Sequence, residues 1–168
     1  MEKSLIIALE SYYRLISEIN ANMIEKAISR LNYIVEKVPG VLLKIGDEEM
    51  SLKPFPDKWS KKEIIGHLID SATNNHQRFV RAQFEMIPEI VYDQVKWNKY
   101  NFYQQIDLSQ IVSFWTIYNK QIVEILKHIP QENLEKQVRV GEDILTIKYL
   151  ILDYIEHLEH HLKQVADY

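Results

Sequence analysis

The 168-residue chain contains no cysteine. Disulfide bonds, iron–sulfur clusters, thiolate zinc sites and cysteine nucleophiles are therefore excluded, and any metal chemistry must use histidine or carboxylate ligands. The absence of cysteine also fits a reducing compartment, so we expect a cytoplasmic protein. Only four glycines are present, which leaves no glycine-rich loop to hold a phosphate and favours long helices over a sheet.

Long apolar runs and clusters of positive charge are missing as well. No run approaches the roughly 18 to 20 apolar residues that cross a bilayer, and we expect no signal peptide after Met1-Glu2-Lys3. The net charge is −4 and the basic residues are scattered, so we expect neither nucleic acid nor a membrane as a partner. The length and the 46% of hydrophobic residues predict one globular domain over residues 1–168.

Apolar residues that recur at steps of three and four indicate helices. The first predicted helix runs from about residue 4 to residue 37, and we expect Pro39-Gly40 to kink or end it, with room for a further turn through Leu43. The expected buried face of this helix consists of Leu5, Leu9, Tyr12, Ile16, Ile19, Met23, Ala27, Leu31, Ile34 and Val38.

Three further helices are predicted. A capping box at residues 60–63 begins the second, which runs to about Met86 along a core stripe of Ile64, Leu68, Ala72, Asn75, Phe79 and Met86. The third covers residues 108–129 and ends at Pro130. The fourth begins near Thr146, after a short hairpin predicted at residues 137–145. The prediction is an all-α protein, a four-helix bundle with a short hairpin before the last helix.

Three histidines are the candidate metal ligands. His157 and His161 are four residues apart in the last predicted helix, so their rings lie on one face about one turn apart. Measured from Leu158, at the centre of the apolar stripe, His161 falls at about −60° and His157 at about −100°, whereas His160 falls near −160°, on the solvent side. His67 lies at about −100° from the core stripe of the second helix. Both helices therefore place histidine on the same shoulder of a core-facing stripe.

Three neutral imidazoles can hold one divalent cation and leave a position open for water or substrate, as in catalytic zinc sites. Zinc is the expected ion, and imidazole ligands also suit nickel, iron(II), copper and cobalt. Because the ligands must be unprotonated, we expect zinc to raise the melting temperature at pH 7.5, and this effect to fade below about pH 6.

The residues quoted above resemble the DinB/YfiT superfamily of metal-dependent proteins. The resemblance rests on residues 58–71, KWSKKEIIGHLIDS, and on the tail with His157, His160, His161 and Gln164. It implies a four-helix bundle with one metal ligand on the second helix and two, four residues apart, on the last, which are His67, His157 and His161. Lys163 departs from the family, where glycine often precedes the glutamine. The resemblance also implies thiol S-transferase or isomerase activity with a low-molecular-weight thiol such as bacillithiol, mycothiol or glutathione.

Other polar residues near these histidines are candidates for the reaction. Asp153 precedes His157 by one turn, where it would orient the imidazole or act as a general base, or else be solvated. Asn74 and Arg78 share the flank of His67, where they would contact a carboxylate or thiol cofactor, or else pack or form an ion pair between helices.

The remaining aromatic residues and histidines have structural interpretations. Tyrosine and tryptophan residues between 91 and 105 are either the wall of a pocket or, as we prefer, the edge of the core. His76 faces away from the His67 flank, and His128 lies in the last turn of a helix, where a cation suits the helix dipole. We expect structural roles for both.

Three functions are consistent with these observations. The first is a metal-dependent enzyme that acts on a small molecule, as a thiol S-transferase or a hydrolase, because a three-histidine site adds no ligand charge and leaves the ion at +2. The second is a non-catalytic metal-binding or stress-response module that acts as a homodimer. The third is a helical interaction domain whose three histidines coincide by chance, which predicts melting that does not depend on zinc.

Overall fold

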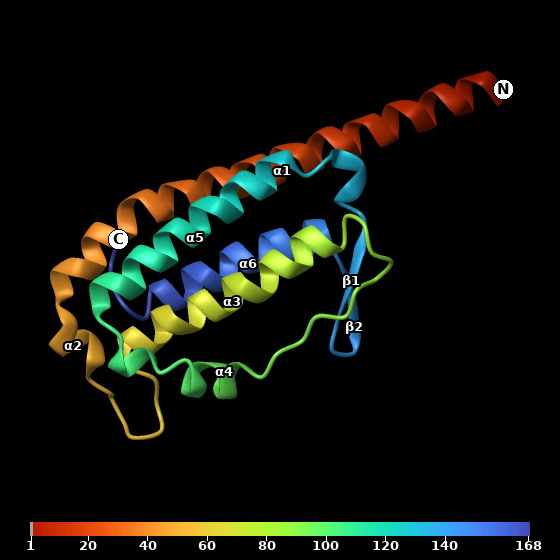
Figure 1. The fold of residues 1–168 in the computed structure, drawn as a ribbon. Helices are drawn as coiled ribbons and strands as arrows, with labels where there is room; N and C mark the ends of the chain where they lie inside the picture. Colours follow the sequence, from red (N-terminus) through yellow and green to blue (C-terminus); the bar gives the residue numbers. More distant parts are fainter. Residues whose placement is uncertain (1) are drawn as a thin grey trace.

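Four long helices form the body of the molecule (Figure 1). A computed structural model describes the backbone of residues 2–168 and the side chains of residues 11, 12, 15, 18, 19 and 21–168. The helices are α1 (Glu2–Ile45), α3 (Lys61–Arg81), α5 (Leu108–His128) and α6 (Ile147–Leu162). Helices α1 and α3 each pack against both α5 and α6, around one continuous apolar core. The predicted four-helix bundle is confirmed.

Short elements connect the long helices. Near one end of the bundle lies α2 (Asp47–Ser51), and near the other lies the antiparallel hairpin of β1 (Gln137–Val140) and β2 (Asp143–Thr146), as Figure 1 shows. Gly141 adopts a φ of 65° in the turn of this hairpin, a conformation that costs glycine little. The predicted hairpin is confirmed. The remaining short elements are α4 (Gln94–Tyr100) and two 3-10 turns, Tyr103–Gln105 and Gln131–Asn133.

Local hydrogen bonds fix where the site-bearing helices begin. The Ser60 hydroxyl accepts from the Glu63 amide at 3.1 Å, and the Glu63 carboxylate accepts from the Ser60 amide at 2.8 Å, which is the predicted capping box. Helix α6 begins after Thr146, whose hydroxyl accepts from the Tyr149 amide at 3.2 Å. Both starts lie where the sequence predicts them.

The predicted end of the first helix, near residue 37, is wrong. The helix continues through Pro39 to Ile45, two residues beyond the further turn that we allowed. Val38 and Leu42, on either side of the proline, are fully buried. Packing of these side chains outweighs the roughly 3 kcal/mol that an interior proline costs a helix.

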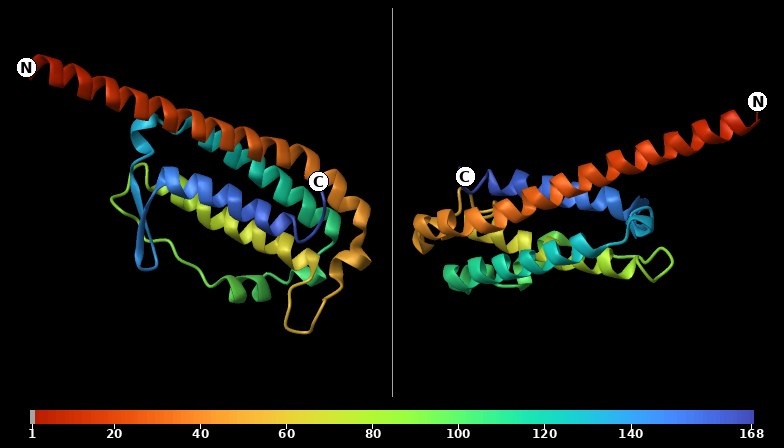
Figure 2. Two further views of the ribbon diagram at one scale, coloured as in Figure 1. Left: turned by 180° about the vertical axis from the view of Figure 1, so that it is seen from behind. Right: turned by 90° about the horizontal axis from the view of Figure 1, so that it is seen from above.

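The predicted buried face of α1 is only partly buried. Its residues from Leu31 onward lie in the core, but Tyr12, Ile19 and Met23 are exposed. At about 1.5 Å per residue, the 44 residues of α1 span roughly 66 Å, about twice the length of α5, so the N-terminal half projects beyond its partners (Figures 1 and 2). The side chains of Leu5, Leu9 and Ile16 lie outside the described residues.

Helix α3 ends at Arg81, earlier than the predicted Met86, which is 94% exposed and not part of the core. The chain turns after Ala82, and Ile87 takes a left-handed φ of 46° that no helix accommodates. Residues 88–106, here called the 88–106 segment, then return along the outside of α3 (Figure 1). None of the helices in the described part of the chain has the length and hydrophobicity that a membrane crossing requires.

Candidate metal centre

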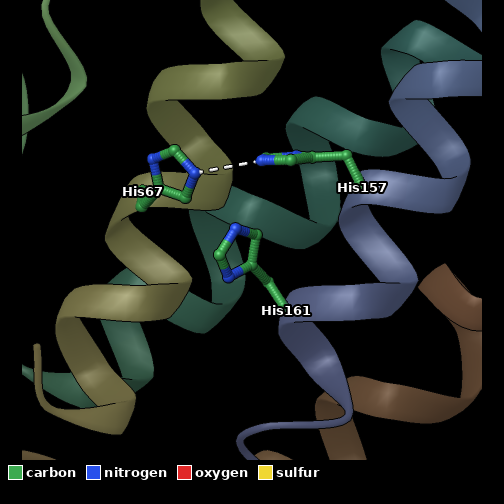
Figure 3. A group of neighbouring side chains, drawn as sticks. All are labelled: His67, His157 and His161. Carbon is green, nitrogen blue, oxygen red and sulfur yellow. Dashed lines mark hydrogen bonds between the residues drawn. The ribbon is translucent and has the colours of Figure 1, made fainter.

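Two helices bring His67, His157 and His161 together. His67 comes from α3, and the other two come from successive turns of α6 (Figure 3). The Nε2 atoms of His67 and His157 lie 3.2 Å apart, and each of the three side chains offers a nitrogen within 4.8 Å of the others. The ring centroids are 4.6 to 5.1 Å apart. The three rings therefore face one small space between α3 and α6.

Helical phase explains this convergence. His67 is fully buried, whereas His157 and His161 are half-buried, one turn apart on the face of α6 that packs against α3. The adjacent His160 is exposed, as predicted. The indole of Trp59 covers the His67 ring at a centroid distance of 4.9 Å. Burial and the tilted contact with Trp59 together restrict the orientation of the His67 ring.

The environment keeps these imidazoles uncharged. Burial, reinforced by the neighbouring His157 and His161, lowers the pKa of His67 to about 3. Burial and the neighbouring His157 and His160 lower the pKa of His161 to about 4, against a smaller opposite effect of Gln164. The pKa of His157 is lowered by burial and by His160. All three side chains are therefore available as neutral ligands at neutral pH.

The residues present fit a divalent cation. Two ligands at about 2.0–2.1 Å from a tetrahedral zinc ion would lie about 3.3 Å apart, close to the 3.2 Å between the Nε2 atoms of His67 and His157. Among the described residues, the Nδ1 atoms of His67 and His161 are buried without a hydrogen-bond partner. Clustered, uncharged imidazoles are costly to bury unless something binds them, and a cation is the ligand that their nitrogens suit.

The other predicted candidates do not join this cluster. Asp153 is exposed one turn before His157. Asn74 donates from Nδ2 to the Asp70 carbonyl at 2.9 Å, within its own helix. Arg78 donates to the Asn75 side chain at 3.3 Å and to the Ile90 carbonyl at 3.1 Å, so it fastens the 88–106 segment to α3.

The two histidines with predicted structural roles, His76 and His128, each make a hydrogen bond outside the candidate metal centre. His76 shares a hydrogen bond of 3.0 Å with the Tyr118 hydroxyl. His128 donates from Nδ1 to the Glu124 carbonyl at 2.7 Å, which closes the last turn of α5. Neither side chain belongs to the cluster of three histidines.

Sequence reasoning did not single out Asp70, which is buried one turn after His67. Its Oδ1 accepts from the Tyr103 hydroxyl at 2.6 Å and from the Asn101 amide at 2.7 Å, and its Oδ2 has no partner among the described residues. Burial raises the pKa of Asp70 to about 6, against the lowering effect of Tyr103 and Asn101. Its position three residues after His67 was the only signal in the sequence.

The raised pKa of Asp70 predicts the pH dependence of an Asp70→Asn variant. A carboxyl whose pKa is higher in the folded state contributes stability below about pH 4, and this stability is lost as the pH rises through about 6. Asparagine does not titrate, so the variant should gain stability relative to the parent between these pH values, by up to about 3 kcal/mol. Urea unfolding of the metal-free proteins at pH 4 and pH 7.5 measures this gain. Parallel pH profiles would contradict the prediction.

The chain is similar to one protein family and to solved structures of two bacterial proteins. The sequence profile of the DinB superfamily matches residues 24–165 of the chain. No curated protein matches it. Among solved structures, YfiT from Bacillus subtilis is 21% identical, with a TM-score of 0.73 over 84% of this chain and 83% of YfiT; it is described as a probable metal-dependent hydrolase with an unusual four-helix bundle topology. The DinB-like protein YjoA from Bacillus subtilis is 18% identical, with a TM-score of 0.60 over 83% of this chain and 86% of YjoA. At these identities the likeness shows the fold.

Proposed function

The chain belongs to the DinB superfamily, and from this membership and the three-histidine geometry we propose that it is a metal-dependent hydrolase of a small molecule. One divalent ion, zinc in our proposal, would be held by His67, His157 and His161. The observation that carries the proposal is the meeting of three uncharged imidazoles, from two helices, within 4.8 Å of one another.

The chemistry of the donor set supports an activating role for the ion. Three imidazoles add no charge, so a bound divalent ion keeps its +2 charge and lowers the pKa of a water molecule or thiol that it binds. Three protein ligands are also one fewer than a closed structural zinc site uses. Each of the chain's own histidines serves this role by remaining unprotonated and by presenting one nitrogen to the shared space.

The comparison with YfiT supports hydrolysis over other reactions of such a site. That protein shares the bundle and is described as a probable metal-dependent hydrolase. A low-molecular-weight thiol would be the alternative nucleophile. One activity screen distinguishes hydrolysis from thiol transfer. Turnover of p-nitrophenyl esters without added thiol would support the proposed hydrolysis. Turnover of electrophiles only in the presence of bacillithiol or glutathione would instead show that the reaction is thiol transfer.

Zinc should stabilise the folded protein at neutral pH. At free zinc 100-fold above its Kd, binding adds about 2.7 kcal/mol, which raises the melting temperature of a chain of this size by about 5 to 10 °C. Protein purified without a histidine tag should also contain about one equivalent of metal by elemental analysis. A chain that contains no metal and whose melting temperature zinc leaves unchanged would refute the proposal.

The lowered pKa values move the pH window of this effect below the one expected from ordinary histidines. Protons compete with the metal where the folded imidazoles titrate, which is at about pH 4 for His161, at about pH 3 for His67 and below the ordinary histidine pKa for His157. The rise in melting temperature caused by zinc should therefore persist below pH 6, where ordinary histidines are protonated, and weaken towards pH 4. Scanning calorimetry from pH 4 to pH 7.5, with and without zinc, measures the window.

A further inference from the structure

A large cleft opens beside the metal centre, at the end of the bundle that carries α2. It has a volume of about 970 Å³, within the range of small-molecule sites. Its walls are the loop between α2 and α3, the start of α3, the side of α4 and the end of α6. The residues that line it are Glu49, Leu52, Lys53, Pro54, Phe55, Asp57, Lys58, Trp59, Lys61, Ile64, Val95 and Gln164.

Three of the lining residues, Trp59, Ile64 and Gln164, lie close to the histidines in space or in sequence. The Trp59 ring lies 4.9 Å from the His67 ring, centroid to centroid. Ile64 precedes His67 by one turn of α3. Gln164 follows the end of α6 and acts on the pKa of His161. None of the three histidines lines the cleft, but Trp59 contacts both the cleft and the His67 ring, so the two sites are neighbours.

Exposed apolar side chains outside the core line much of the cleft. Leu52 and Phe55 are each 65% exposed and Val95 is 60% exposed, although all three lie around the same hollow. Trp59, Pro54 and Ile64 complete the apolar lining. Exposed apolar side chains around one concave site, next to a reactive centre, are typical of ligand-binding grooves.

Some of the charges in the cleft are paired within the protein, whereas Asp57 and Lys58 make no ion pair among the described residues. Lys53 pairs with Glu63 at 2.9 Å, and Lys61 pairs with Glu49 at 2.7 Å. The lining offers no cluster of unpaired cations of the kind that a phosphate or a dicarboxylate requires. The buried polar atoms without a partner among the described residues do not belong to any residue of the lining. The accessible surface of the walls is therefore mainly apolar, with a few charged side chains among the apolar ones.

We infer that this cleft binds the apolar part of the substrate, so that the substrate is a small hydrophobic molecule that carries a hydrolysable group. This inference rests on the proposed function for the reactive group, which would lie at the histidines while the apolar part contacts Leu52, Phe55 and Val95. Sugars and nucleotides, which need many hydrogen-bond partners, fit the mainly apolar surface of the cleft less well.

Two probes test the inference. Acetohydroxamate and octanohydroxamate have the same metal-binding group and differ by six methylenes, each worth up to about a fourfold gain in affinity when buried. Octanohydroxamate should bind the zinc-loaded protein on the order of 100-fold more tightly by calorimetry, since part of its chain stays in water. Phe55→Ser should reduce this preference at least about tenfold. Phe114→Ser, which removes a phenyl ring 53% exposed on α5 outside the cleft, should leave it unchanged.

The second probe separates failure of the cleft from failure of the metal site. The neutral fluorophore N-phenyl-1-naphthylamine should bind the metal-free protein, and Phe55→Ser should weaken its binding while Phe114→Ser should not. If this pattern holds while zinc does not bind, the proposed function fails and the apolar cleft stands. Equal affinities for the two hydroxamates, or fluorophore binding that is indifferent to Phe55→Ser, would overturn the inference.

Discussion

Replacing His161 by alanine is expected to lower zinc affinity on the order of 10³-fold and to abolish turnover. The loss should exceed the roughly 10- to 100-fold that removal of an outer hydrogen bond to a metal ligand costs, because one of three ligands is gone. The folded protein should tolerate the change, since His161 is only half-buried and its Nδ1 makes no hydrogen bond within the described residues. Competition with a chromogenic chelator measures the zinc affinity of the metal-free variant.

The chain supplies a matched control in the adjacent residue. His160 has the same ring and lies on the same turn of α6, but it is exposed and stands outside the cluster of three histidines. His160→Ala should keep zinc affinity within about threefold of the parent, as expected for a surface substitution away from the ligands. Equal losses in the two variants would indicate nonspecific binding of metal to surface histidines and would remove the basis of the proposed site.

Replacing Gly66 by alanine is expected to destabilise the protein by about 3 kcal/mol or more, although alanine normally favours a helix by about 1 kcal/mol. A Cβ atom on residue 66 would lie 2.1 Å from Cδ2 and 2.3 Å from Cγ of Tyr103. The ring cannot move away freely, because its hydroxyl donates to Asp70 at 2.6 Å. A decrease in melting temperature of about 10 °C is the expected measurement.

Gly40→Ala is the matched control for this variant. Gly40 also lies inside a helix, α1, and a Cβ there would meet nothing within 4 Å. The substitution should therefore stabilise the protein by up to about 1 kcal/mol. The two alanines are thus expected to act in opposite directions at helical positions. A stabilising Gly66→Ala would show that the 88–106 segment does not press on α3 as described.

The parts of the fold that could be predicted are those controlled by neighbouring residues. The reciprocal bonds of Ser60 and Glu63 mark the start of α3 in the sequence itself, and Thr146 does the same for α6. The predicted third helix, 108–129, differs from α5 by one residue at its end. Helical phase also put His67 and His161 on facing sides of their helices, because two amphipathic helices in one bundle turn the same kind of face inward.

The parts that could not be predicted depend on contacts between distant residues. The hydrogen bond between Tyr103 and Asp70 joins positions 33 residues apart, and no sequence pattern around either residue predicts it. The passage of α1 through Pro39 depends on the burial of Val38 and Leu42 by other helices. Local propensity and tertiary packing oppose each other at such positions, and only the folded structure shows which one prevails.

The 88–106 segment and the loop at residues 52–58 both form walls of the cleft, but they are held to the bundle to different extents. The 88–106 segment is fastened at its start by the reciprocal bonds of Ile90 and Pro88 with Arg139, each 3.0 Å, and farther along by Asn98, which donates to the Glu63 carbonyl at 2.8 Å. The loop at residues 52–58, by contrast, is exposed and makes one backbone bond within itself, from the Lys58 amide to the Phe55 carbonyl. Of these two walls of the cleft, the loop is therefore held by fewer bonds, and it is the easier one for a bound molecule to displace.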